Sequence, residues 1–173
     1  MKVLKIIGKS LVGIVSIVVT LFLIVFISLN VGKFVIYSEY YGMKTNVCTN
    51  PGLNDGFVCQ GVAVVDGKEK IIVSGYMNDD SASRIYVTDF DSNSYYVRLN
   101  KKEKVFTGHT GGIAVTGNNV YLASGSYVYT FPLDSLLNSK NGDIVEIGAG
   151  TKMAITASCV YTDDNYLYLA IAA

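Results

Sequence analysis

Residues 108–126 read "GHTGGIAVTGNNVYLASGS". Two short apolar runs flank the turn-forming "GNN" at 117–119, and glycine and serine bound the stretch on both sides. Short apolar runs on either side of such a turn are typical of a β-hairpin. The stretch therefore predicts two antiparallel strands, and the rest of the chain decides to which β fold they belong.

The composition agrees with an ordered β domain. The chain has 173 residues, half of them apolar, with 13 Tyr, no Trp and only 2 Pro. Residues 34–173 carry 10 basic and 14 acidic residues, which leaves a net charge of −4. A mildly acidic domain lacks the basic surface that nucleic acids require, so we expect no nucleic-acid partner.

The hairpin recurs along the chain. "GIAVTGNNVYLAS" (112–124) and "SCVYTDDNYLYLA" (158–170) align without a gap at an offset of 46, with Thr116 on Thr162 and Asn119 on Asn165. "GVAVVDGKEKIIVSG" (61–75) follows the same plan 51 residues earlier, with a longer turn. Such periods are typical of four-stranded propeller blades. The alternative is a chance likeness among β-rich segments.

The segments between the hairpins supply further strands. Residues 84–90 and 95–99 alternate around the turn "DSNS" (91–94), and "YVYTFPLDSLLNSKNGDIVEIG" (127–148) contains a strand, a short polar excursion and another strand. Each complete unit therefore has four strands joined in order, as in an antiparallel meander.

From about residue 57 onward, the chain resembles β-propeller repeat proteins. "RIYVTDFDSNS" (84–94) is similar to blades of extracellular bacterial YVTN-type propellers, and "GHTGG" followed by "LASGS" (122–126) is similar to WD repeats. Phe131 and Pro132 stand where a WD repeat has Trp-Asp, so the WD family itself is not implied. The resemblance implies an all-β ectodomain of propeller-like four-stranded antiparallel blades, about two and a half in an open arc.

The third hairpin ends in "NYLYLAIAA" (165–173). We expect residues 166–171 to form a strand that is paired on one side only. A propeller typically closes with at least four blades, so we expect these residues to be the N-terminal part of a longer propeller or a truncated gene product.

A membrane helix is predicted before the β domain. Residues 10–32 contain no charge and are long enough to cross the hydrocarbon core as a helix. A cleaved signal peptide is the alternative, although this run exceeds the usual length. Three lysines (Lys2, Lys5 and Lys9) precede the run and Lys33 follows it, which favours a cytoplasmic N-terminus and an extracytoplasmic remainder. The predicted parts are a tail (1–9), the helix (10–32), a juxtamembrane linker (33–56) and the β domain (57–173).

The chain has three cysteines. Cys48 and Cys59 bracket ten turn-rich residues, and a disulfide could close this loop in an oxidising compartment; two unpaired cysteines are the alternative. Cys159 lies in an apolar run, where we expect it to be reduced and buried.

Few residues are candidates for chemistry. His109, the single histidine, is either a ligand at the mouth of a central channel or a group that hydrogen-bonds a neighbouring turn. Asp79 and Asp80 precede Arg84 in a loop, where they are candidates for binding but are typical of solvated turns. Asp89, Asp91 and Asn93 have calcium-loop spacing, but the required glycine and glutamate are absent, so a polar turn is expected.

Two function classes follow. The first is a membrane-anchored, non-catalytic module that binds a protein or glycan partner outside the membrane, for which no cofactor or metal is expected. The alternative is the N-terminal part of an extracytoplasmic propeller enzyme, lactonase-like or quinoprotein-like, whose site residues lie mostly beyond this chain. A structural subunit of an envelope complex is not distinguished from the first class, because fold alone does not decide function.

Overall fold

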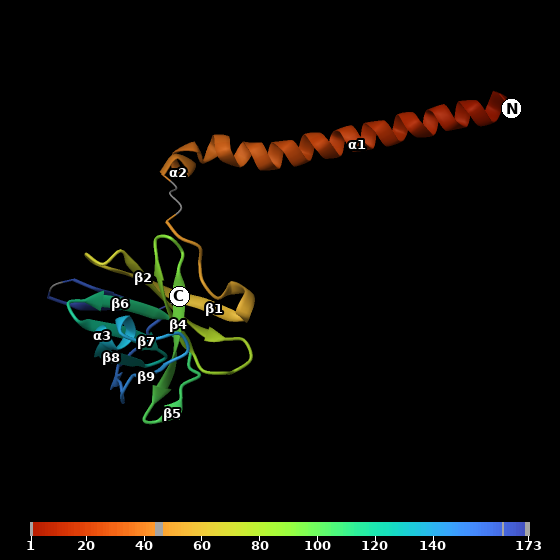
Figure 1. Cartoon of the computed structure of the whole chain (residues 1–173). Helices are drawn as coiled ribbons and strands as arrows, with labels where there is room; N and C mark the ends of the chain where they lie inside the picture. Colours follow the sequence, from red (N-terminus) through yellow and green to blue (C-terminus); the bar gives the residue numbers. More distant parts are fainter. Residues whose placement is uncertain (1, 44–46, 164, 172–173) are drawn as a thin grey trace. The chain divides into compact units, whose positions relative to one another are not determined.

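The structure is a computed structural model that describes residues 2–43, 47–163 and 165–171. The chain divides into two compact units, Met1–Asn46 and Val47–Ala173. The first is helical, with α1 (Lys2–Ile36) and α2 (Ser38–Met43), and the second consists mainly of β-sheet (Figure 1). The expectation of a β-rich domain preceded by an apolar helix is therefore confirmed.

Helix α1 is longer than the predicted 10–32. Within it, Val12–Ile36 is long and apolar enough to cross a membrane, and nearly all of its side chains are exposed. The predicted linker 33–56 is divided between the two units. Its first residues continue α1 and α2, whereas the residues from Val47 onward belong to the β unit. There they form the 3-10 turn η1 (Leu53–Asp55).

The first sheet contains the predicted four-stranded antiparallel meander. Its strands, in order, are β1 (Phe57–Val65), β2 (Lys70–Met77), β3 (Arg84–Asp89) and β4 (Ser94–Lys101). The short β5 (Lys104–Val105) extends it beyond β4. Because side chains alternate along strands, Ile72, Ile85 and Val97 share one face, which we call the core face. Val73, Tyr86 and Tyr96 share the opposite face, which we call the outer face.

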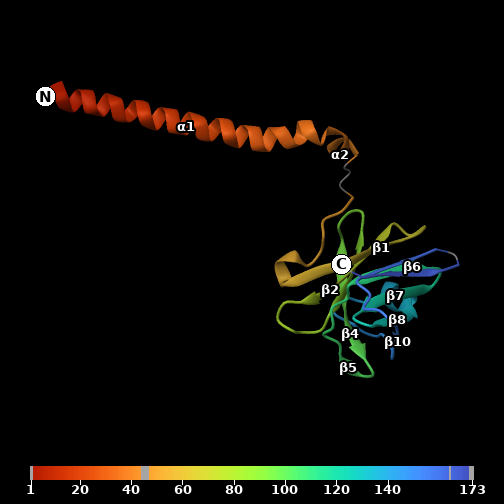
Figure 2. The same cartoon turned by 180° about the vertical axis from the view of Figure 1, so that it is seen from behind.

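The second sheet has the order β10-β8-β7-β6. Its strands are β6 (Gly112–Thr116), β7 (Asn119–Ser124), β8 (Tyr127–Pro132) and β10 (Thr151–Lys152), which Figure 2 shows from behind. Residues 112–124 therefore form a hairpin, as predicted. The polar excursion after β8 contains the short helix α3 (Asp134–Leu137), which buries Leu136.

The prediction that the end of 127–148 forms the fourth strand of this second sheet is wrong. The strand predicted near the end of 127–148 is β9 (Ile144–Glu146), and it pairs in parallel with β4 of the first sheet. Its Val145 is buried there beside Leu99. Thr151–Lys152 takes the fourth place instead. Burial of Val145 and Ile147 in the core explains why the chain crosses back to the first sheet.

The third hairpin consists of β11 (Cys159–Thr162) and β12 (Leu167–Ala170). Among the described residues, β12 pairs with β11 alone. This agrees with the expectation of a strand at 166–171 that is paired on one side. Cross-strand pairing places Tyr161 opposite Tyr168, and their rings lie 5.8 Å apart.

The main core lies between the first and second sheets. Aliphatic side chains of the core face pack against one face of the second sheet, together with Leu136 and Val145; the buried set includes Ile72, Ile85, Val97, Leu99, Ile113, Val120, Leu122 and Phe131. The segment that joins the two sheets is held by two buried serines, one in β2 and one in the loop directly before β3. Ser83 Oγ donates to the Gly108 carbonyl at 2.7 Å, and Ser74 Oγ donates to the Thr110 carbonyl at 3.2 Å.

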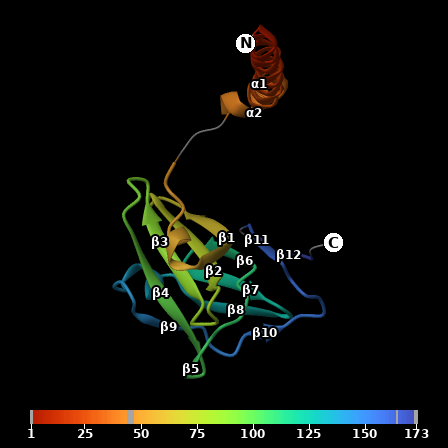
Figure 3. The ribbon, with the colours of Figure 1, turned by 90° about the vertical axis from the view of Figure 1, so that its right-hand side faces the viewer.

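The first strands of the three hairpins lie next to one another. Strand β6 contacts β1 on one side and β11 on the other (Figure 3). A Cβ atom at Gly61 would lie 2.9 Å from the Ile113 nitrogen, and one at Gly112 would lie 2.6 Å from the Val160 nitrogen. Only glycine allows backbones to approach this closely, so these two glycines set the spacing of the hairpins.

We expect Gly112→Ala to destabilise the β unit by roughly 1–3 kcal/mol, because its methyl group would push the backbone of β11 away from β6. Thermal unfolding of the full chain in detergent, followed by near-UV circular dichroism of its tyrosines, measures the effect. Gly42→Ala is the control, since a Cβ there meets nothing within 4 Å. Equal unfolding curves for both variants would contradict the close approach.

Candidate functional site

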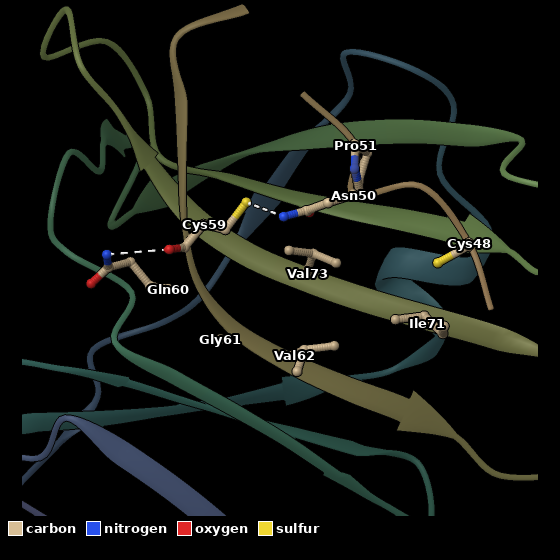
Figure 4. Close-up of a pocket in the computed structure, with 9 residues that line it drawn as sticks. All are labelled: Cys48, Asn50, Pro51, Cys59, Gln60, Gly61, Val62, Ile71 and Val73. Atoms are coloured by element: carbon tan, nitrogen blue, oxygen red, sulfur yellow. Dashed lines mark hydrogen bonds between the residues drawn. The ribbon is translucent and has the colours of Figure 1, made fainter. Parts of the chain in front are cut away.

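A pocket opens on the outer face of the first sheet. Its volume is about 390 Å³. Ile71 and Val73 of β2 line it from the sheet, and Cys48, Asn50 and Pro51 line it from the segment that precedes η1 (Figure 4). Ile71 and Val73 are buried, whereas Val62 at the rim is 65% exposed. The pocket is thus mainly apolar, and two cysteines contribute to its wall.

The two cysteines carry free thiols in the structure. The Asn50 side-chain amide donates a hydrogen bond to Cys59 Sγ at 3.0 Å. Figure 4 shows the sulfur atoms of Cys48 and Cys59 well separated. A disulfide requires Cα atoms within about 7 Å and Cβ vectors that point toward each other, so bond formation would need the 48–51 segment to move. The Cys48–Cys59 bridge stays a prediction.

Cys159 is exposed, and the expectation that it is buried is wrong. The hairpin register explains the difference. Cys159 pairs with Ala170 and Tyr161 pairs with Tyr168, so all four share one face of a two-stranded sheet. The pairs on the other face, Val160 with Leu169 and Thr162 with Leu167, are partly buried.

His109 lies at the surface and stacks on Tyr76. The two ring centroids are 4.0 Å apart and the rings are inclined by 28°. Among the described residues, the His109 side chain makes no hydrogen bond to a neighbouring turn, contrary to one of the two expectations. The stack on Tyr76 holds the ring instead. Its position is set by the buried Thr110 that follows it and by Gly108, whose carbonyl is bound by Ser83.

The structure does not bring Asp79, Asp80 and Arg84 into one ion-paired group. Asp79 accepts a hydrogen bond from the Ser81 backbone at 3.0 Å, and hydrogen bonds from Ser81 hold the pKa of Asp79 below its usual value. Asp80 adopts a positive φ of 58°, as turn residues do. Within the described ranges, neither carboxylate lies within 4.0 Å of the Arg84 guanidinium.

The other acidic loop also behaves as a turn. Asp89 accepts hydrogen bonds from the Asn93 backbone at 2.8 Å and from the Asn93 side chain at 3.2 Å. It also lies 3.6 Å from Lys70 Nζ. In the part of the chain that the structure describes, no group of three or more His, Cys, Asp or Glu side chains is placed to hold a metal ion.

Arg84 belongs to an aromatic cluster on the outer face. Its guanidinium lies 4.2 Å from the Tyr96 ring centroid, and Nη1 donates to the Tyr86 hydroxyl at 3.3 Å. Tyr86 is buried against Phe57, with ring centroids 4.8 Å apart, and burial raises the pKa of its hydroxyl. Arg98, which the sequence reasoning did not single out, lies directly opposite Arg84 on β4.

The candidate site is therefore the outer face of the first sheet, with an apolar pocket near β1 and an arginine-tyrosine cluster on β3 and β4. Comparison of the chain with protein-family models, with curated proteins and with solved structures finds no match.

We expect His109→Ala to lower the stability of the β unit by about 0.5–1.5 kcal/mol, the usual contribution of one aromatic stack. His109→Phe keeps a ring on Tyr76 and should restore most of the loss. Thermal unfolding of the two variants measures both effects. A loss of several kcal/mol in His109→Ala, with no rescue by phenylalanine, would show that His109 makes another, stronger interaction.

For the cysteines, we expect a Cys48–Cys59 bridge in the exported full chain, because an oxidising compartment favours disulfides in short loops. Alkylation under non-reducing conditions followed by mass spectrometry identifies each thiol. Cys159 is an internal control, since its exposed side chain should be alkylated in the native protein. Finding Cys48 and Cys59 alkylated as fully as Cys159 would refute the bridge.

Proposed function

We propose that the chain is a single-pass membrane protein whose extracytoplasmic, propeller-like β unit binds a protein or glycan partner without catalysing a reaction. The N-terminal helix is its anchor in this proposal. The free outer face of the first sheet, rather than a closed active site, is the surface that meets the partner.

The main support for this proposal is the stacking of the three hairpins against one another. Gly61 lies against Gly112 and Ile113, and Gly112 lies in the same manner against Cys159 and Val160. Gly61 therefore corresponds in space to Gly112, 51 residues later, and Gly112 corresponds to Cys159, 47 residues later. The first offset equals that of the sequence alignment, and the second exceeds the aligned offset of 46 by one residue. Successive hairpins side by side at their first strands are the arrangement of neighbouring blades around a propeller axis.

Two further observations support an anchored binding module. The apolar stretch Val12–Ile36 has exposed side chains that a lipid environment would cover. On the β unit, Val62 and Val64 are 65% and 58% exposed beside the pocket, and exposed apolar groups next to a pocket are typical of interaction surfaces.

The placement of the titratable groups favours binding over catalysis. The His109 ring is stacked on Tyr76, and the carboxylates of Asp79 and Asp89 accept hydrogen bonds within their own turns. A general acid or base needs a neighbouring group that orients it toward a substrate. These three groups instead stabilise loops.

Labelling of Cys159 on intact cells tests the topology. In a full-length chain with Cys48→Ser and Cys59→Ser, a membrane-impermeant maleimide should label Cys159, because its side chain is exposed and the β unit lies outside. A chain that also carries Cys159→Ser is the control. Labelling that appears only after the cells are permeabilised would contradict the proposal.

A photo-crosslinking residue at Val62 tests binding in the same cells. We expect a crosslinked product of higher mass, whereas the same residue at Lys68, exposed in the β1–β2 turn, should give none. Unmodified chain at both positions would contradict partner binding at the outer face.

A further inference from the structure

The sequence contains two arginines, Arg84 and Arg98, and the fold places them side by side. They are paired residues of β3 and β4, so their side chains leave the same face of the sheet. Directly opposed residues in antiparallel strands have Cα atoms about 4.5–5.5 Å apart. Arg98 is exposed and Arg84 is half-buried, so both lie at or near the solvent on the outer face.

Like charges at directly opposed positions destabilise a sheet unless something compensates them. In the described residues, the single ion pair joins Lys70 and Asp89, and no carboxylate lies within 4.0 Å of either guanidinium. Acidic groups in this region are engaged in other contacts, including Asp143 next to Gly142, whose carboxylate accepts a hydrogen bond from the Lys140 backbone at 2.7 Å. Asp55 accepts a hydrogen bond from the Tyr86 hydroxyl at 3.5 Å, and Asp79 accepts one from Ser81.

The two side chains are also held in position. Arg84 stacks on Tyr96 and donates from Nη1 to Tyr86, while its Nε is buried without a partner. Arg98 donates from Nε to the Gly142 carbonyl at 3.0 Å. Each of these contacts uses only part of a guanidinium that has five N–H donors. The remaining donors are oriented before any ligand arrives, which lowers the entropic cost of binding.

We propose that Arg84 and Arg98 form a binding site for an oxyanion of a ligand, namely a carboxylate, sulfate or phosphate group. The planar fork of a guanidinium matches the paired oxygens of these groups, and two forks on one face can hold a single group from two sides. The ligand's negative charge would remove the repulsion between the two arginines. This proposal rests on the binding function proposed above and specifies the chemistry of the partner.

Binding of defined anionic probes to the full chain in lipid nanodiscs tests the site. The probes are oligogalacturonate for carboxylate, dextran sulfate for sulfate and polyphosphate for phosphate, with unmodified dextran as the neutral control. We expect at least one anionic probe to bind, with an affinity that falls as salt is added, and the neutral dextran not to bind. The probe that binds most tightly identifies the oxyanion.

The variant Arg98→Gln tests whether the arginines bind the probe. Arg98 is suitable because it is exposed, so that its replacement leaves the core intact. Loss of one charge-assisted hydrogen bond should weaken binding roughly tenfold to a hundredfold. Arg98→Lys keeps the charge but not the fork and should give an intermediate loss. Lys152→Ala, which removes one exposed charge from β10, should leave the affinity unchanged. Thermal unfolding checks that each variant is folded.

Three results would overturn the site. They are the absence of binding to every anionic probe, an affinity that Arg98→Gln does not change, and an equal loss in Lys152→Ala, which would indicate unspecific charge attraction. The cell-labelling experiment is independent of these results. A cytoplasmic Cys159 together with arginine-dependent binding would refute the proposed location and leave the oxyanion site standing.

Discussion

The close approach of backbones at Gly61 and Gly112 is the constraint on which the rest of the β unit depends. At each position a Cβ would lie within 3 Å of a backbone nitrogen on the next hairpin. Hydrogen is the only substituent that fits, so the three hairpins can lie side by side at a fixed spacing. At this spacing, aliphatic side chains such as Ile72 and Ile113 belong to one continuous core.

This arrangement gives the first sheet two chemically different faces. The core face carries aliphatic side chains, including Ile85 and Val97, which are fully buried against the second sheet. The outer face carries Tyr86, Tyr96 and both arginines, and only part of it is covered by the segment that leads into β1. Polar and aromatic side chains therefore gather where the stacking of hairpins leaves a face of the sheet partly uncovered.

The local parts of the fold were predictable from the sequence, because strand alternation and turn chemistry act over a few residues. All three hairpins and the strand pair around 91–94 were found in this way. The parallel pairing of Ile144–Glu146 with β4 was missed, since parallel contacts join residues far apart in sequence and leave no turn between them. The exposure of Cys159 could not be predicted, because the apolar run around it does not show which face of the hairpin is covered, and a one-residue shift exchanges the two faces of a strand.

The candidate site was only partly predictable for the same reason. Arg84 was singled out together with Asp79 and Asp80, which are its neighbours in sequence, whereas its partner in space is Arg98. Pairing counted back from the predicted turn at 91–94 places Arg84 opposite Lys101, whereas the observed register pairs Thr88 with Ser94 and so brings Arg84 opposite Arg98. The apolar pocket was not predictable either, because it forms only where Cys48 and Pro51 fold back over β2.

Nuclear Overhauser spectroscopy of the isotope-labelled full chain in detergent micelles tests the stacking of the hairpins most directly. We expect strong cross-peaks between the Gly61 Hα and the Ile113 amide proton, and between the Gly112 Hα and the Val160 amide proton. Cross-peaks between Gly112 and its hairpin partner Ala123 serve as the internal reference. If the reference peaks are present and both inter-hairpin peaks are missing, the hairpins form but do not stack, and the close approach at Gly61 and Gly112 is refuted.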